Sequence, residues 1–347
     1  MCKKTSLITG EILVYDENGK LESSYPFNSF VKNYLAWLRF AFGDNASPVR
    51  MINGSTVLSV SEMSPNNGST ELSYGLCAGT DSMAEDIDQY KLGSTLTNSN
   101  ASCSTTGIGP IDADSEQASF KIGRNFTNIS GGNISISEIV YFLHFYSAGY
   151  SITSTLIVTY DLISPGVVIS PASTKKFEIK LSCALPLTLN FANSLRRLFS
   201  ATDATISIID IDGVSRTVSY DSDKTMYLNA LSTNTNVSIV VGDGDAEAVM
   251  DDYILESQIT ALTHSSTTMH PVSVSGTRAS LIIERTFTNS TGSEVMVKEV
   301  GIYARLQYSS SNYYSYMIYR KVLEQALKIP NASSETIQIE FYVDYSE

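Results

Sequence analysis

The sequence has few of the residues that most often carry enzyme chemistry or bind nucleic acid. Its 347 residues include three histidines, four cysteines and one tryptophan, and only 17% of the residues are charged. The formal net charge is −13, and no basic stripe offsets it. Because such a chain repels phosphate backbones, we expect no nucleic-acid partner.

Motifs of catalysis are absent as well. The sequence has no GxSxG elbow, Walker loop, GxGxxG fingerprint or HExxH helix. His144, His264 and His270 have no carboxylate or thiol partners at metal-site spacing, so ordinary strand or loop positions are predicted for them. The acidic loops 112–116 and 243–245 lack the twelve-residue calcium pattern, and solvated loops are favoured there. We therefore predict no enzyme activity, no catalytic residue, no metal site and no cofactor.

Long apolar runs are also missing. No run is long enough to span a bilayer, and residues 1–6, MCKKTS, lack the apolar core of a secretion signal. We expect no membrane insertion. The protein then acts in the cell, leaves it by lysis, or has already lost a signal.

The four cysteines, Cys2, Cys77, Cys103 and Cys183, form no CxxC pair. Two interpretations stay open. They are small buried residues, or Cys77 and Cys103 form a disulfide across a loop rich in Ser, Thr and Asn.

Uncharged polar residues make up much of the chain, and ten Asn-x-Ser/Thr triplets occur among them. Such triplets arise by chance in this composition, so N-glycosylation and an unmodified polar surface both stay open. The triplets begin at Asn45, Asn53, Asn67, Asn100, Asn125, Asn128, Asn133, Asn236, Asn289 and Asn331.

Internal similarity runs through most of the chain. Arg124–Asn128, RNFTN, reappears as Arg285–Asn289, RTFTN, and Glu138–Ile139 reappears as Glu299–Val300, each 161 residues later. Weaker matches join 79–92 to 242–255, 172–173 to 332–333 and 33–38 to 193–198, at offsets of 163, 160 and 160 residues. Offsets that drift so little predict a tandem duplication with small loop changes.

The predicted fold is mainly β, with two homologous β-sandwich-like domains. We place an N-terminal hairpin arm at 1–28, the first domain at 29–183 and the second at 184–347. Apolar residues at helical spacing predict that a short helix opens each domain, at 30–42 and 191–199. Alternation predicts strands elsewhere, among them 177–181 and 336–345.

Three glycine turns between alternating runs predict hairpins, at Asn18-Gly19, Asn53-Gly54 and Asp212-Gly213. We predict two-residue turns in which both central residues have positive φ. The first hairpin belongs to the arm, for which two roles stay open. It adds a strand pair to its own domain, or it crosses to a neighbouring subunit.

The repeated charged residues invite a catalytic interpretation. Arg124 and Glu138 flank Ser130–Gly132 symmetrically, as Arg285 and Glu299 flank Gly292. If each connection is a hairpin, the two members face each other on the apolar side of a sheet. We predict structural ion pairs, Arg124 with Glu138 and Arg285 with Glu299, in preference to chemistry.

The repeat unit resembles a domain of structural proteins of tailed phages and archaeal viruses. The resemblance rests on a Gly-rich strand end, an acidic Tyr/Leu segment, an Arg-x-Phe-x-Asn strand and the run Lys298–Tyr303, KEVGIY. It covers about a third of each repeat. The first copy departs from the pattern with Ser137–Phe142, SEIVYF, which suggests adaptation to another contact.

The resemblance implies a tail, baseplate, fibre or tube component. We accordingly expect a non-enzymatic subunit that assembles with copies of itself and with other virion proteins, in a virion or an extracellular assembly. A secreted adhesin or surface-layer protein is the alternative, and a glycan-active enzyme is the third.

Overall fold

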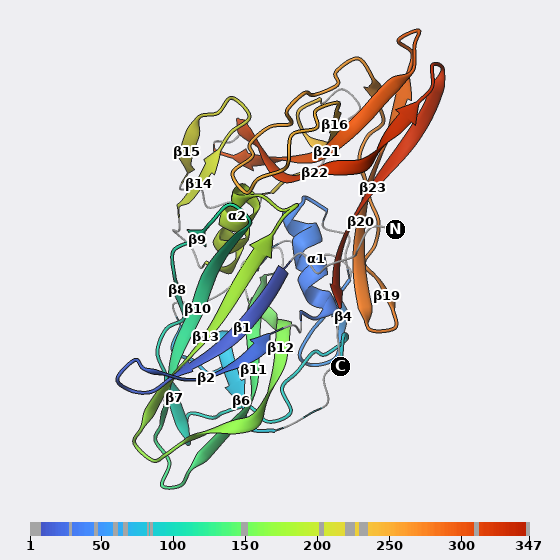
Figure 1. Ribbon diagram of the computed structural model, residues 1–347. Helices are drawn as coiled ribbons and strands as arrows, with labels where there is room; N and C mark the ends of the chain where they lie inside the picture. Colours follow the sequence, from blue (N-terminus) through green and yellow to red (C-terminus); the bar gives the residue numbers. More distant parts are fainter. Residues whose placement is uncertain are drawn as a thin grey trace.

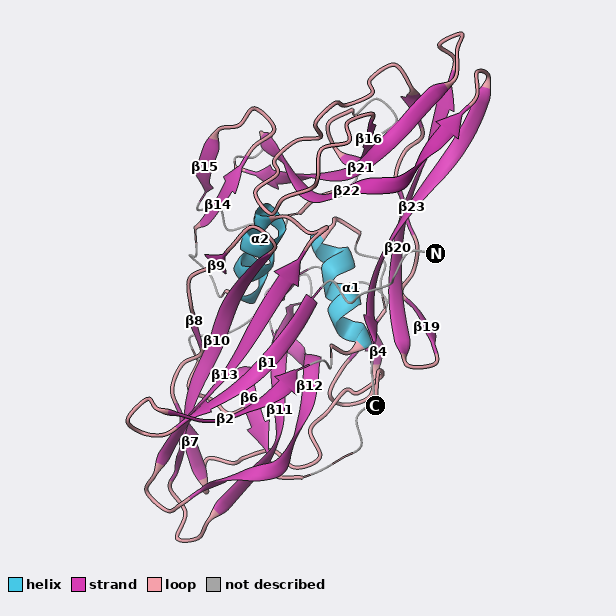
Figure 2. Ribbon diagram, viewed as in Figure 1, coloured by secondary structure: helices cyan, strands magenta, loops and turns pink. Residues whose placement is uncertain are grey.

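The computed structural model is mainly β, with two short helices (Figures 1 and 2). It describes residues 8–27, 30–44, 48–57, 62–64, 69–81, 83, 86–146, 152–200, 205–218, 226–228, 235–308 and 312–344.

The first half forms two larger sheets around a helix. The first sheet has the order β2-β1-β13-β10-β7, with β8 and β9 also on β10, and the second has the order β12-β11-β5, with β6 also on β11. The elements are β1 (Ile8–Tyr15), β2 (Leu21–Phe27), α1 (Lys32–Ala41), β3 (Val49–Arg50), β4 (Thr56–Val57), β5 (Glu62–Ser64), β6 (Gly75–Gly79), β7 (Ala101–Cys103), β8 (Gly107–Ile108), β9 (Asp112–Ala113), β10 (Gln117–Asn128), β11 (Ile134–Tyr146), β12 (Ile152–Ile169) and β13 (Thr174–Ala184).

The second half has the same order of pairings after its helix. One sheet is β16-β21-β22, and the other is β17-β20-β18 with β19 and β23 also on β20. The elements are α2 (Leu189–Phe199), β14 (Ile206–Ile209), β15 (Ser215–Val218), β16 (Ser238–Gly242), β17 (Thr263–His264), β18 (Thr268–Met269), β19 (Ser273–Ser275), β20 (Arg278–Asn289), β21 (Val295–Gln307), β22 (Tyr313–Ile329) and β23 (Ser333–Asp344).

Both predicted helices are present, with bounds that differ by one to two residues at each end. They lie between the strands of the first half and those of the second (Figure 1), and α1 contacts β20 and β23 while α2 contacts β10. Aromatic side chains join the halves there. The Trp37 ring meets that of Phe199 at 5.0 Å between centroids, and Phe42 meets Phe341 at 5.4 Å. The main apolar core therefore continues through both halves.

The three glycine hairpins form, but with three-residue loops and not the predicted two-residue turns. Gly19, Gly54 and Gly213 have φ of 78°, 83° and 77°, whereas the preceding Asn or Asp does not have positive φ. In the second half the Gly213 N–H donates to the Asp210 carbonyl, and the Asp210 N–H donates to Val214. This is a turn followed by a left-handed glycine, which needs only one residue without a Cβ.

Each half also contains a buried asparagine where the chain passes from one sheet to the other. Asn128 ends β10, and its amide donates to the carbonyls of Gly132 and Ile169. Asn289 ends β20 and donates to Ser293 and Ile329 at 2.8 and 2.7 Å. Both asparagines are fully buried. These bonds fix the sharp connection between strands that belong to different sheets.

The N-terminal hairpin packs on its own chain, the first of the two roles left open. β1 pairs with β13 from Ile8–Cys183 to Tyr15–Lys176 in antiparallel register. Ile12 and Val14 are fully buried, and an ion pair joins Glu22 to Lys175. The arm therefore contributes to the core of the first half.

We predict that Asn289→Ala lowers the free energy of unfolding by about 2–4 kcal/mol, because it leaves buried carbonyls without donors. Urea unfolding measures the change. Asn331→Ala is the matched control, since Asn331 is exposed and accepts one hydrogen bond from the Gly292 N–H. Equal effects of the two substitutions would contradict a special role for Asn289.

Candidate functional site

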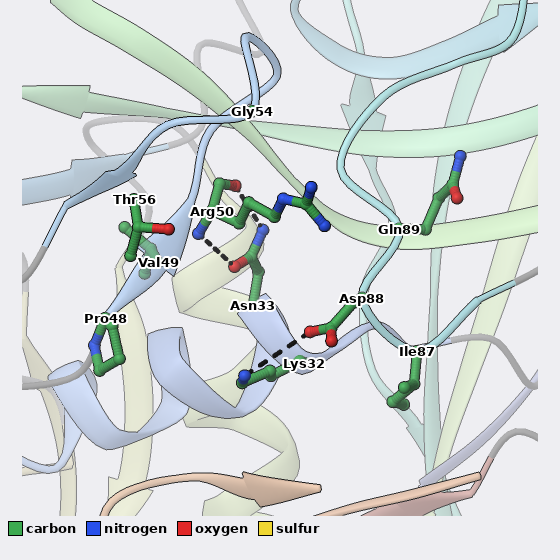
Figure 3. A pocket seen from close by; sticks show the side chains of 10 residues that line it. All are labelled: Lys32, Asn33, Pro48, Val49, Arg50, Gly54, Thr56, Ile87, Asp88 and Gln89. Atoms are coloured by element: carbon green, nitrogen blue, oxygen red, sulfur yellow. Dashed lines mark hydrogen bonds and ion pairs between the residues drawn. The ribbon is translucent and has the colours of Figure 1, made fainter. Parts of the chain in front are cut away.

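A pocket of about 340 Å³ opens beside the start of α1, between the β3–β4 hairpin and residues 87–89 (Figure 3). Its polar lining includes Lys32 and Asn33 at the start of the helix, Arg50 on the hairpin, and Asp88 and Gln89 on the loop. The volume lies at the low end of pockets that bind small molecules.

Asn33 holds the hairpin to the helix. Its amide donates to the Arg50 carbonyl at 2.8 Å, and its side-chain oxygen accepts the Arg50 N–H at 2.9 Å, as the two dashed lines in Figure 3 show. Asn33 is 5% exposed, so both bonds are shielded from water. They position the backbone from which the Arg50 side chain extends toward the loop.

The Arg50 side chain stacks on an aromatic ring at the pocket. Its guanidinium carbon lies 3.8 Å from the centroid of the Tyr90 ring. Within the described residues this guanidinium has no hydrogen bond or ion pair to protein atoms, so its five N–H groups are available to a ligand. A planar donor fork of this kind suits a carboxylate.

The remaining charges in the pocket partly neutralise each other. The Lys32 ammonium lies 3.6 Å from an Asp88 carboxylate oxygen (Figure 3), and both side chains are partly exposed. The Gln89 amide donates to the Lys91 carbonyl, which orients it at the rim. With Arg50, the pocket carries one net positive charge on an acidic protein.

The same scaffold recurs in the second half without these charges. Asn190 donates to the Ile209 carbonyl and accepts the Ile209 N–H at 2.9 Å each, as Asn33 does with Arg50. The roles align Asn33 with Asn190, 157 residues later, which corrects the sequence match of 33–38 with 193–198. Leu189 and Ile209 accordingly stand where the first half has Lys32 and Arg50.

The prediction of an ion pair between Arg124 and Glu138 is wrong, because their strands do not form a hairpin. Arg124 lies on β10, paired with Phe177 of β13, whereas Glu138 lies on β11, paired with Leu162 of β12. The connection leads from one sheet to the other, so the symmetric spacing about residue 131 did not place the side chains together.

Arg124 is 1% exposed and is satisfied by backbone carbonyls. Its five N–H groups reach five carbonyl oxygens, those of Ser69, Glu71, Tyr74, Leu76 and Ser104. Because β6 belongs to the second sheet, the bond to Leu76 joins the two sheets. The prediction of a structural role fits these contacts, although the partner is different.

Arg285 repeats these contacts in the second half. It is 1% exposed, and it donates to Ser265, Val237 and Ile239. Burial lowers the pKa of Arg285 to about 10, which leaves it charged at neutral pH.

The acid of the second pair, Glu299, is paired with Arg320 and not, as predicted, with Arg285. The Arg320 Nε lies 2.9 Å from a Glu299 carboxylate oxygen, and its Nη1 lies 2.8 Å from Asp252. The N–H groups of Glu256 and Ser257 also donate to Glu299. The fully buried carboxylate is thereby compensated.

Glu138 solves the same problem without an arginine. Its carboxylate accepts the Tyr160 hydroxyl at 2.6 Å and the Gly93 N–H at 3.1 Å, while its second oxygen has no hydrogen-bond partner in the described residues. Tyr160 pairs with Val140 and Arg320 with Gly301, at matching register positions. The sequence comparison missed this exchange because it did not align β12 with β22.

The predicted disulfide is absent: Cys77 and Cys103 are free thiols, as is the buried Cys183. Cys77 donates to the Tyr74 carbonyl, and Cys103 donates to Thr70. Burial raises the pKa of Cys183 to about 12. The interpretation as small buried residues holds for Cys77 and Cys183, while Cys103 is half-buried and Cys2 lies outside the described residues.

The structure separates the Asn-x-Ser/Thr triplets. Asn128 and Asn289 are fully buried, which excludes glycosylation of the folded chain at both. Asn100 is half-buried, and five asparagines are exposed, namely Asn53, Asn125, Asn133, Asn236 and Asn331. Asn45 and Asn67 lie outside the described residues.

The acidic loops and the histidines bring no metal ligands together: among the described residues, no three His, Cys, Asp or Glu side chains form such a group. Asp114 accepts the N–H groups of Glu116 and Gln117, and Asp245 pairs with Lys298 at 3.0 Å. His144 is 1% exposed and stacks on the Tyr74 ring at 4.0 Å. Burial lowers the pKa of His144 to about 4.

Neither helix in the described part of the chain is long and apolar enough to cross a bilayer. No protein-family model, curated protein or solved structure matched the sequence.

We predict that Arg320→Ala lowers the free energy of unfolding by about 3–5 kcal/mol, because Glu299 then stays buried without a cation. Urea unfolding checks the value. Arg278→Ala is the control, since Arg278 pairs with the partly exposed Asp344 and should cost about 1 kcal/mol or less. Similar losses in both variants would contradict the buried pair's importance.

A pH dependence follows from His144. The unfolded chain protonates His144 below its ordinary pKa of 6.5, whereas the folded chain protonates it only near pH 4. The unfolded state therefore binds more protons in this window, and stability falls by about 3 kcal/mol as the pH drops from 6.5 to 4. Urea unfolding across this range should show a smaller fall for His144→Phe, which keeps the stack on Tyr74. An identical fall in both proteins would count against His144 as the source.

Proposed function

We propose that the chain is a non-enzymatic structural subunit that assembles with copies of itself into part of a virion or a virus-like filament. A difference between two corresponding sheet edges carries the proposal. β13 has β1 along its outer edge, but within the described residues no strand lies along that edge of β23. The free N–H and C=O groups of an edge strand are a template for a strand of another chain.

The two edges correspond because, in this proposal, the halves are copies of one sandwich-like domain. β13 pairs with β10 through Phe177 and Arg124, and β23 pairs with β20 through Ile337 and Arg285. Ala172 and Ala332, which precede these strands, both have the rare left-handed backbone, with φ of 59° and 57°. A strained conformation at equivalent positions supports common descent of the halves.

The other end of the first sheet offers the complementary edge. β2 ends the order β2-β1-β13-β10-β7, and Leu21, Glu22 and Ser24 on it are exposed. Pairing of β2 in one copy with β23 in the next uses two different surfaces. Such a head-to-tail contact forms a ring when the rotation closes and a filament when it does not. Other virion proteins would then bind at the ends of the assembly.

Negative-stain electron microscopy and light scattering of the full chain, across concentrations, test the proposal. Rings, tubes or fibres are expected for the unchanged chain. The double variant Ser24→Lys, Gln338→Lys adds charge to the exposed β2 and β23 edges and should reduce assembly about tenfold or more.

Ser290→Lys adds a lysine to the exposed 289–294 connection and should assemble normally. Monomers of the unchanged chain at every concentration would overturn the proposed function. Assembly that resists the double substitution would instead show that other surfaces make the contact.

A further inference from the structure

The pocket beside α1 differs from its counterpart in the second half in ways that all favour an anion. The shared parts are architectural: an asparagine that holds a hairpin to a helix, and a tyrosine beside the hairpin glycine, which is Tyr90 at Gly54 and Tyr253 at Gly213. The charged parts are not shared. Since the second half folds with Leu189 and Ile209, the fold does not require Lys32 and Arg50.

The helix starts differ in the same direction. In the second half the Thr188 hydroxyl caps α2 by accepting the Phe191 N–H. In the first half Val31 occupies the cap position, no side chain caps α1, and its first turn has no acidic residue. The positive end of α1 therefore lacks a side-chain acceptor beside the pocket that its first two residues line.

We propose that this pocket binds a small sugar that carries a carboxylate group. Arg50 receives the carboxylate through the open edge of its guanidinium, whose flat face is already held by the Tyr90 ring. Lys32 contributes a second positive charge.

The sugar part of the ligand follows from the acceptors on the opposite wall. Asp88 is 45% exposed at its side chain, and the Gln89 side-chain oxygen lies beside it on the same loop. Both accept hydrogen bonds from hydroxyl groups. A simple anion would use only the donors, whereas a carboxylated sugar uses both walls.

Saturation-transfer NMR titration of the full chain with glucuronate tests the proposal, with glucose and acetate as partial ligands. We expect a Kd of about 1 mM for glucuronate, as befits a ligand of this size. Glucose and acetate should each bind about tenfold more weakly or worse.

Arg50→Gln should weaken glucuronate binding about tenfold or more, because it removes the charged fork. Lys91→Gln is the matched control. It removes a nearby exposed positive charge that does not line the pocket, and it should change the Kd by about twofold or less.

Thermal unfolding of Arg50→Gln establishes that the variant is folded, and Arg50→Lys provides a second variant that keeps the charge but loses the fork. Failure of glucuronate to bind, or binding unchanged by Arg50→Gln, would overturn the proposal. Equal affinity for acetate would refute the sugar, and equal affinity for glucose would refute the carboxylate.

Discussion

The buried guanidinium groups of Arg124 and Arg285 are the contacts on which each half of the molecule depends. Each side chain starts on one sheet and donates to carbonyls of a strand in the other, Leu76 for Arg124 and Ile239 for Arg285. A buried charge is costly unless every donor is satisfied, and Arg124 uses all five of its N–H groups. The spacing of the two sheets, and with it the path of the loops over β10, follows from this requirement.

Around that shared frame the halves differ where a buried or surface charge can change without loss of the fold. The buried glutamate is met by a tyrosine hydroxyl in the first half and by Arg320 in the second. The hairpin beside the helix carries Arg50 in one half and Ile209 in the other. One outer edge is covered by β1, and the corresponding edge of β23 has no strand among the described residues. These differences lie at positions that the shared packing does not dictate, which is why both proposals rest on them.

Much of the local structure could be predicted from the sequence. Apolar spacing located both helices, alternation located the long strands, and glycine located three hairpins. The predictions failed where a residue's partner lies far along the chain. Symmetric spacing about a turn suggested that Arg124 faces Glu138, but the chain crosses between sheets there. The cysteines were too few and too distant for spacing to show whether they meet, and nothing in the Asn128 triplet distinguishes it from the exposed triplet at Asn331.

The sequence by itself determined the secondary structure and the recurrence of one pattern in two halves, because backbone preference and apolar period are local properties. Only the tertiary structure decided which carbonyls satisfy the buried arginines, which cation meets Glu299, and that Lys32, Arg50 and Asp88 line one pocket. Those outcomes depend on side chains brought together by strand pairing and helix packing. Their energies depend on burial, and burial is a property of the folded chain as a whole.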